Sequence, residues 1–322
     1  METTPLGRDG PAVSRIGLGL AAVGRPAYIT TSRDTDLGAD RTETAFRDRT
    51  RRLLDAAYAA GVRYVDVARS YGSAEAFLAG WMSDRGDVGD LVVGSKWGYT
   101  YVGGWDVTAA VQEVKELSLA TFERQFAETR ALLGTRLRLY QVHSLTIESG
   151  VLDDVPLLSA LAEHRRQGLL IGITTTGPNQ AATIRQALDV SVDGLPLFAS
   201  VQATWNLLEP SAGEALAEAS AAGWAVLVKE AVANGRLTDA GDAGVPGTPL
   251  GEAAVAAGVT PDVLALGAAL AQPWASVVLS GAATTAQLAS NLRAPAAPVD
   301  AVGDLAEPPT RYWATRSSRP WT

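Results

Sequence analysis

The sequence predicts an α/β fold, a closed (β/α)8 TIM barrel, and three observations support this prediction. Eight short segments rich in β-forming residues alternate with segments of helical periodicity, which implies parallel strands. No glycine-rich dinucleotide fingerprint accompanies these segments, which favours a closed barrel over a doubly wound sheet. A chain of 322 residues, 47% of them hydrophobic, suits one barrel as well as two domains, and the repeated alternation favours a single domain over residues 1–322.

The predicted elements follow in order from the N-terminus. Turn residues between short apolar pieces at 5–14 predict an N-terminal β-hairpin. The predicted barrel strands span 15–20, 64–67, 91–96, 137–143, 169–174, 199–203, 224–229 and 276–279. Helical spacing of apolar residues predicts helices at 44–60, 118–133 and 155–166, with Ala-rich helices further on. Long active-site loops are predicted at 24–42 and 97–116, and a C-terminal tail, 295–322, over the barrel mouth.

The composition excludes several functional classes. A net charge of -8, without a stripe of Lys and Arg, argues against binding to nucleic acid or an anionic membrane. The absence of cysteine excludes disulfides and thiolate chemistry, and with only two histidines we expect no metal site. No apolar run approaches the roughly 20 residues that span a bilayer. We therefore expect a cytoplasmic protein with a small-molecule partner, and the sequence contains no indication of its oligomeric state.

Four polar residues lie at or just after the ends of predicted strands. Asp66 ends the second strand, Lys96 the third and His143 the fourth, and Tyr71 follows Asp66 by five residues. Each alone has an ordinary explanation as a helix cap, a solvated strand end, a packed core histidine or a loop-packing residue. Because the carboxyl ends of barrel strands meet at one mouth, the four are more simply explained together, as a catalytic site.

This group of side chains suits one kind of chemistry. A phenol has a pKa of about 10, and a nearby ammonium lowers that pKa. We therefore expect Lys96, held by Asp66, to make Tyr71 a usable general acid, and His143 to orient a carbonyl oxygen. Protonation of a carbonyl oxygen promotes a reaction when a nucleophile or a hydride adds to the carbonyl carbon. A hydride from a bound nicotinamide is the natural candidate, because the sequence offers no evident nucleophile or phosphate loop.

The motifs around these residues resemble those of the aldo-keto reductase family. The four residues lie in VDVARSYG, VGSK and LYQVH, and the similarity extends to IGLG near the N-terminus, VQATWNLL at 201–208 and SGAATTAQLASN at 280–291. The resemblance implies an NAD(P)H-dependent carbonyl reductase, or the reverse alcohol oxidation, with Tyr71 as general acid/base and Asp66, Lys96 and His143 completing the catalytic tetrad.

The same resemblance implies cofactor positions, some of which depart from the family pattern. Gln202 matches the glutamine that holds the nicotinamide carboxamide, and Gly235 is placed to contact the pyrophosphate. Lys229 stands where the family commonly has an aromatic that stacks on the nicotinamide. Basic residues that bind the 2′-phosphate are missing from 280–291, so we expect NADPH from the family and leave NADH open. The full predicted set is Thr174, Thr175, Gln202, Lys229, Gly235, Gly281, Gln287 and Asn291.

Aromatic residues in the long loops are candidates for a substrate pocket. We predict Tyr28, Trp97, Tyr101 and Trp105 as its walls, although about half of such aromatics simply pack loops onto a barrel. Walls of this kind suit a neutral aldehyde, ketone or sugar lactol.

Two alternative functions remain open from the sequence. The departures at Thr175 and Lys229 are compatible with a cofactor-binding regulatory or interaction subunit that has little turnover. A barrel lyase or isomerase that uses Tyr71 and Lys96 without a nicotinamide is the other alternative, and it predicts no nucleotide binding.

Overall fold

A computed structural model describes residues 1–30, 33–297 and 302–321, and its centre is a closed barrel of eight parallel strands. This confirms the predicted fold. The barrel strands are β3 (Ile16–Gly19), β4 (Tyr64–Asp66), β5 (Val92–Trp97), β8 (Leu137–Leu145), β9 (Leu170–Thr175), β12 (Ser200–Thr204), β13 (Ala225–Lys229) and β14 (Val277–Ser280). They pair in chain order, and parallel pairing of β14 with β3 closes the ring.

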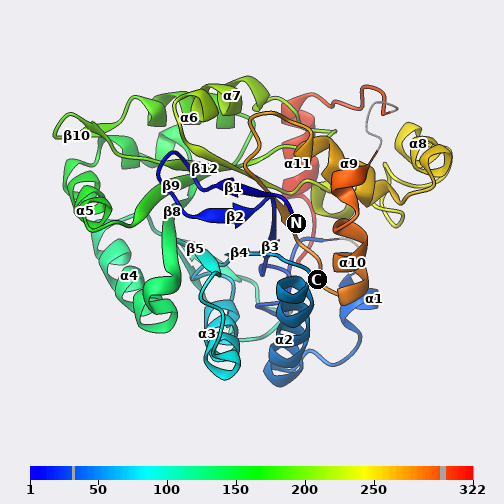
Figure 1. Ribbon diagram of the computed structural model, residues 1–322, viewed down its shortest axis with the longest axis horizontal. Coiled ribbons are helices and arrows are strands. Elements are labelled where there is room, and N and C mark those ends of the chain that lie inside the picture. Colours follow the sequence, from blue (N-terminus) through cyan, green and yellow to red (C-terminus); the bar gives the residue numbers. More distant parts are fainter. Residues whose placement is uncertain (31–32, 298–301, 322) are drawn as a thin grey trace.

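Helices surround the barrel, as Figure 1 shows. They are α1 (Arg33–Leu37), α2 (Glu43–Ala59), α3 (Ala74–Arg85), α4 (Leu119–Leu133), α5 (Val155–Arg166), α6 (Gln180–Leu188), α7 (Gly213–Ala221), α8 (Pro249–Ala257), α9 (Pro261–Leu270), α10 (Thr285–Asn291) and α11 (Pro309–Ser317). Short 3-10 turns lie at Gly134–Arg136, Ile147–Ser149, Val151–Asp153, Ala233–Gly235 and Ala294–Ala296. Hydroxyl caps such as Thr42 on α2 and Ser118 on α4 accept backbone hydrogen bonds at helix starts.

An N-terminal hairpin closes the bottom of the barrel. Strands β1 (Thr3–Pro5) and β2 (Ala12–Ser14) pair antiparallel, which confirms the predicted hairpin, and they cross the middle of the view in Figure 1. Leu6 and Val13 from the hairpin pack with Tyr64, Leu139 and other inward-facing strand residues in one buried cluster. The barrel interior is therefore a filled core, which leaves the opposite end, where the strands finish, as the place for a candidate site.

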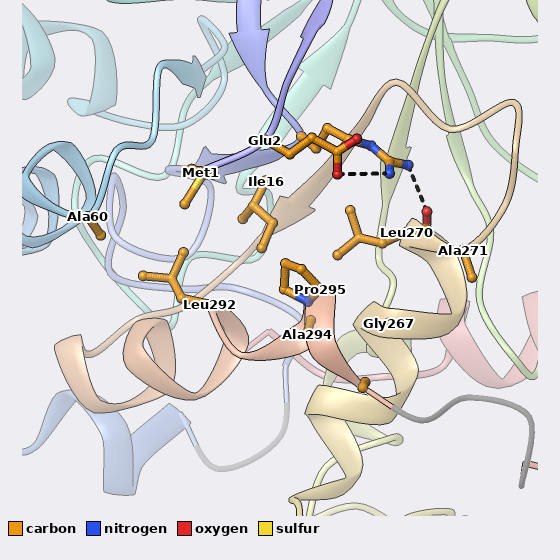
Figure 2. Close-up of a pocket in the computed structure, with 12 residues that line it drawn as sticks. Met1, Glu2, Ile16, Ala60, Gly267, Leu270, Ala271, Leu292, Ala294 and Pro295 are labelled. Atoms are coloured by element: carbon orange, nitrogen blue, oxygen red, sulfur yellow. Dashed lines mark hydrogen bonds and ion pairs between the residues drawn. The ribbon is translucent and has the colours of Figure 1, made fainter.

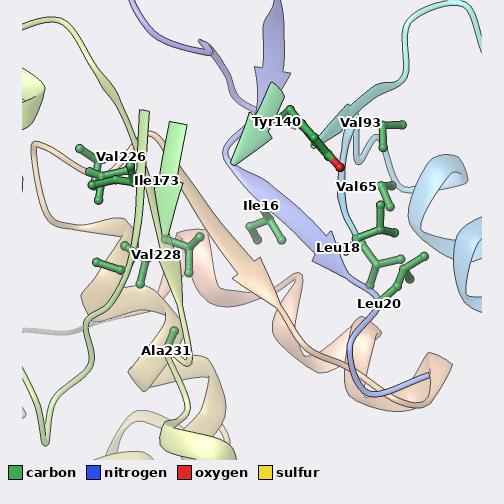
Figure 3. Packing of buried hydrophobic residues seen from close by; sticks show 14 of the residues in the cluster. Ile16, Leu18, Leu20, Val65, Val93, Tyr140, Ile173, Val226, Val228 and Ala231 are labelled. Carbon is green, nitrogen blue, oxygen red and sulfur yellow. The ribbon is translucent and has the colours of Figure 1, made fainter. Parts of the chain in front are cut away.

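A second apolar layer lies between the barrel and its helices. Ile16, Leu18, Val65, Val93 and Ile173 alternate with inward-facing neighbours along their strands, and Figure 3 shows their side chains in this layer. Strand residues buried on both faces explain why the predicted strands are short and almost continuously apolar.

The long loops contain more structure than the sequence predicted. Within 97–116, strands β6 (Tyr99–Tyr101) and β7 (Glu113–Lys115) form an antiparallel hairpin, so the prediction of an unstructured loop was wrong there. The 24–42 segment includes α1, and residues 31–32 of this prediction lie outside the described residues. Strands β10 (Ser191–Val192) and β11 (Leu195–Pro196) form another small hairpin.

Within the described ranges, no single helix is both long and apolar enough to cross a membrane. Helices α8 and α9 pass that test only as a pair, and they are bent by 93° relative to each other.

Candidate functional site

The register of β4 and β5 brings two oppositely charged side chains together inside the barrel mouth. Asp66 pairs with Gly94, so Lys96, two residues further along β5, points to the same inner face. The Lys96 ammonium donates to Asp66 Oδ2 and to the carbonyl oxygen of Val67, the latter at 3.0 Å. Gln202 on β12 donates to the other carboxylate oxygen of Asp66 at 2.8 Å. The buried charge pair is therefore well satisfied by hydrogen bonds.

Tyr71 reaches this pair from the loop after β4. Its hydroxyl oxygen accepts a hydrogen bond from Lys96 Nζ at 3.1 Å. Gly72 adopts φ 58°, and a Cβ there would lie 2.8 Å from the Cβ of Arg25, so glycine is required by both backbone conformation and space. Ser73 N also donates to the carbonyl oxygen of Gly24 at 2.8 Å. This close approach of two loops holds Tyr71 over Lys96.

The environment of Tyr71 differs from the sequence prediction in one respect. We expected Lys96 to lower the pKa of the phenol. In the structure, burial and then the negative charge of Asp66 raise the pKa of Tyr71 well above its ordinary value, although Arg25 opposes this. The expectation was wrong because desolvation of the phenolate outweighs the attraction of nearby cations. Tyr71 is thus protonated at neutral pH, as a proton donor must be.

His143 is turned toward Tyr71 by an irregularity in β8. The pairing of β8 with β9 shifts register between Val142 and Leu145, and Ser144 adopts a left-handed φ of 54°. The His143 ring lies 5.7 Å from the Tyr71 ring and 4.9 Å from the Tyr99 ring, centroid to centroid. Burial, and then the charge of Lys96, lower the pKa of His143 well below its ordinary value, so the imidazole is neutral at pH 7. Its Nδ1 has no hydrogen-bond partner among the described residues.

Arg25 is a site residue that the sequence did not reveal. It is 3% exposed, and its guanidinium lies 5.5 Å from the Tyr71 ring centroid. It donates to the carbonyl oxygen of Ser70 at 2.8 Å and to Glu113 at 2.7 Å. Arg25 therefore links the loop carrying Tyr71 to the β6–β7 hairpin. A single arginine between Gly24 and Pro26 gives no signal in one sequence, because its partners are 45 or more residues away.

The buried carboxylate of Glu75 connects the segments that carry Lys96 and Tyr71. Glu75 on α3 pairs with Arg69 at 2.6 Å and accepts from the hydroxyls of Ser95 and Thr129 at 2.6 and 2.9 Å. Ser95 precedes Lys96, and Arg69 N donates to the Lys96 carbonyl oxygen at 3.2 Å. This network fixes both the strand that carries Lys96 and the loop that carries Tyr71.

A further cation enters the mouth at the end of β13. Lys229 Nζ donates to Thr204 Oγ1 at 2.7 Å, and Thr204 Oγ1 donates to Glu230 at 2.9 Å. Glu230 forms an ion pair with Arg316 of α11 at 2.6 Å. Burial lowers the pKa of Lys229 to about 8. Burial alone would raise the pKa of Glu230, but the positive charges of Arg316 and then Lys229 outweigh it and lower that pKa to about 2. Helix α11 is therefore attached to the mouth by a buried charge pair.

The depressed pKa of Glu230 predicts how stability depends on pH. Because its pKa falls from 4.5 in the unfolded reference to about 2, the stabilisation is complete above pH 4.5 and is lost as pH falls toward 2. The largest contribution is about 3 kcal/mol. In urea denaturation, Glu230→Gln should be clearly less stable than wild type at pH 6, with the difference shrinking toward pH 3. Parallel pH dependences of the two proteins would contradict this.

The structure brings several predicted cofactor residues to the mouth but shows that other contacts occupy their polar groups. Thr174 Oγ1 accepts from Ser144 N at 2.7 Å, and Thr175 Oγ1 donates to Gln180 at 3.4 Å. Gln287 Oε1 accepts from Thr284 N at 3.3 Å in a capping box on α10 and from Ala283 N at 2.8 Å. Asn291 is hydrogen-bonded to Ser280 Oγ at 2.8 Å.

The two predicted cofactor glycines differ in conformation. Gly235 has φ 93°, whereas a Cβ at Gly281 would meet no atom within 4 Å. Substitution at Gly281 is thus limited by neither space nor conformation.

The segment after β13 has an unusual backbone conformation. Glu230, Ala233 and Asn234 all have φ between 50° and 57°, which is uncommon for residues other than glycine. Several N–H groups of this segment donate within its own turns, among them Ala233 N to the carbonyl oxygen of Glu230 at 2.8 Å and Gly235 N to that of Val232 at 3.0 Å. Within the described residues, no group of three metal-ligating side chains gathers anywhere.

The predicted substrate residues separate into two groups. Tyr28 lies near the mouth, with its ring 5.5 Å from the Arg25 guanidinium. Tyr101 accepts from Trp105 N at 3.0 Å.

The other two aromatics pack outward. Trp105 packs on Phe46 of α2 and Phe77 of α3, with centroids 5.5 and 6.2 Å away. Trp97 is fully buried, 5.2 Å from Phe122 of α4, so its predicted place in the pocket was wrong. Neighbouring strand residues point to opposite faces, and Lys96 takes the inner one.

A cavity of about 510 Å³ lies away from this site, near the start of β3 (Figure 2). Its walls are mostly apolar and come from the N-terminus, α9 and the turn after α10, and Arg15 pairs with Glu2 at 3.6 Å on one side. None of the predicted site residues lines it.

Comparison with known proteins agrees with this architecture. The profile of the Aldo/keto reductase family matches residues 15–302. A solved structure of a putative aldo-keto reductase from Pseudomonas aeruginosa is 24% identical, covers 91% of this chain and 95% of its own, and has a TM-score of 0.64. The holo form of the aldo-keto reductase AKR11C1 from Bacillus halodurans is 22% identical, covers 96% and 97% of the two chains, and has a TM-score of 0.70. No curated protein matches the sequence significantly.

Proposed function

We propose that this chain, which belongs to the aldo/keto reductase family of oxidoreductases, reduces a small carbonyl compound to an alcohol with NADPH. The observation that carries the proposal is the hydrogen-bonded chain from Gln202 through Asp66 and Lys96 to the Tyr71 hydroxyl, with the neutral His143 beside it. This arrangement offers a proton to a carbonyl oxygen and nothing that would attack the carbon.

Each residue has a distinct task in the proposed reaction. A bound nicotinamide supplies the hydride that the carbonyl carbon receives. Tyr71 gives its proton to the carbonyl oxygen, and Lys96 stabilises the phenolate that this leaves. Asp66 and Gln202 keep the ammonium in place, so the charge is oriented before the reaction begins. His143 has a buried, unpartnered Nδ1 and orients the carbonyl by a hydrogen bond through its ring.

The predicted cofactor-binding residues accommodate a dinucleotide in part. Gly235, which follows Ala233 and Asn234 in a run of left-handed residues, would contact the pyrophosphate, and Gln202 has a side-chain oxygen available for a carboxamide. Around the adenosine end, Gln287 and Asn291 are committed to contacts within the protein. Arg293 is exposed beside Thr260 and Ser290, and it is a cation available there for a 2′-phosphate.

Nucleotide binding is the first test of this function. Titration with NADPH and separately with NADH, followed by quenching of the eight tryptophans, should show saturable binding with NADPH tighter. Equal affinities would mean that no cation recognises the 2′-phosphate. Binding of either nucleotide without turnover of any aldehyde, ketone or sugar would instead support a regulatory subunit, and absence of binding would contradict the proposal altogether.

A further inference from the structure

Lys229 places a positive charge in the part of the mouth where the reaction is proposed to occur. It is the last residue of β13, pairs in register with Thr204 of β12 and faces the inside of the barrel mouth. Asp66, Lys96 and Gln202 also face inward at this end of the barrel, where they are hydrogen-bonded to one another. The charge of Lys229 interacts with Lys96 and Asp66 and contributes to lowering the pKa of His143, so its field reaches the catalytic groups.

Among the described side chains, no carboxylate forms a direct ion pair with this ammonium, although the charges of Glu230 and Asp66 act on it from further away. Its hydrogen-bond acceptor is the hydroxyl of Thr204, and the nearby Glu230 carboxylate is engaged by Arg316 and by Thr204. Among residues with described side chains, no carboxylate oxygen lies within 4.0 Å of Lys229 Nζ. Trp313 of α11 covers the amine on another side, with its ring centroid 5.8 Å away. Because Lys229 is only partly exposed, a cation there acts on its surroundings more strongly than it would at the open surface.

We infer that the Lys229 ammonium makes this site bind the reduced nicotinamide more tightly than the oxidised one, and so favours carbonyl reduction over alcohol oxidation. The inference rests on the proposed function. In that reaction the C–H bond of the dihydronicotinamide breaks, its two electrons and hydrogen form the new C–H bond at the carbonyl carbon, and the Tyr71 proton forms the O–H bond. The ring thereby changes from neutral to positively charged.

The ring must lie close to Lys229 for this transfer to occur. Hydride donor and acceptor carbons approach to about 3–3.5 Å, and the carbonyl oxygen has to contact the Tyr71 hydroxyl. The donor ring therefore lies over the part of the barrel mouth that Lys96, Gln202 and Lys229 line. A fixed cation repels the pyridinium and is indifferent to the uncharged dihydropyridine.

Direct binding measurements test this inference without relying on turnover. At pH 7 the wild-type protein should bind NADPH at least about tenfold more tightly than NADP⁺, and Lys229→Met should reduce that ratio by about tenfold, since each tenfold step corresponds to about 1.4 kcal/mol. Lys115→Met is the matched control, because Lys115 lies near the same mouth, where its Nζ donates to the carbonyl oxygen of Ser144 at 2.7 Å, but it is exposed, so solvent and salt screen its charge more than that of Lys229. The inference would be overturned if the ratio of the two affinities in Lys229→Met stayed within twofold of wild type. It would also be overturned if Lys115→Met changed the ratio as much as Lys229→Met does.

The wild-type protein offers a second test that needs no variant. Lys229 faces Glu230, Arg316, Lys96 and Asp66, and its pKa is about 8. Calorimetry at pH 7–8 in buffers of different ionisation enthalpy should therefore detect proton release on binding NADP⁺ and much less on binding NADPH. The preference for NADPH should also weaken as pH rises from 7 to 9, but stay level in Lys229→Met. Equal proton release with both forms would contradict the inference while leaving the proposed function intact, whereas failure of both nucleotides to bind would overturn both.

Discussion

Replacement of Tyr71 by Phe should abolish carbonyl reduction and leave the fold and nucleotide binding nearly unchanged. The hydroxyl is the proposed proton donor, and loss of a general acid typically costs 10²–10⁴-fold in rate. Lys96 keeps its bonds to Asp66 and to the Val67 carbonyl oxygen, so the variant loses one hydrogen bond, about 1 kcal/mol. Steady-state kinetics on an aldehyde panel and NADPH titration would measure the two effects separately.

Tyr99→Phe is the matched control for this variant. The Tyr99 ring packs against the same histidine, 4.9 Å from His143, but it is carried by β6. We expect this variant to retain activity within about tenfold, because a residue outside the proton path contributes far less than the general acid. Retention of most activity by Tyr71→Phe would remove the tyrosine from the mechanism.

Lys96→Met should lower both activity and stability. Lys96 is 1% exposed, and its removal leaves the buried Asp66 carboxylate with Gln202 as its remaining hydrogen-bond partner. Removing one member of a buried ion pair costs about 3–5 kcal/mol because the other charge is left uncompensated. The Tyr71 phenolate also loses its ammonium, so kcat should fall sharply. Urea denaturation at pH 7 measures the first effect and single-turnover reduction measures the second.

The double variant Lys96→Met with Asp66→Asn distinguishes these two roles. Neutralising Asp66 removes the uncompensated charge, so the double variant should recover much of the lost free energy of unfolding but none of the activity. Recovery of activity together with stability would show that Lys96 acts only through the fold.

The residues that the sequence located correctly are those with strong local patterns. Strand-forming runs lead to Asp66, Lys96 and His143, although β5 and β8 continue to Trp97 and Leu145. Parallel strands in a barrel all finish at one mouth, so the spacing along the chain was enough to group these side chains. Their proposed roles were argued from side-chain chemistry and from the family resemblance.

Two errors arose where the sequence argument left out a local or physical effect. The outward direction of Trp97 was available from strand alternation, since it follows the inward-facing Lys96. The raised pKa of Tyr71 could not be predicted from the sequence, because it depends on how completely neighbouring loops bury the phenol. Burial is a property of the assembled chain, and charge proximity alone predicted the opposite direction.

The sequence by itself determined the barrel, its N-terminal hairpin and the positions of Asp66, Lys96 and His143 near the carboxyl ends of their strands, because these depend on local propensity and periodicity. Only the tertiary structure decided that Arg25 lies against Tyr71, that Arg316 pairs with Glu230 and that Lys229 has a hydroxyl rather than a carboxylate as its partner. These contacts join residues 25 to 86 positions apart, and no local pattern specifies them. Long-range packing therefore sets the electrostatics of the mouth, while local pattern sets its framework.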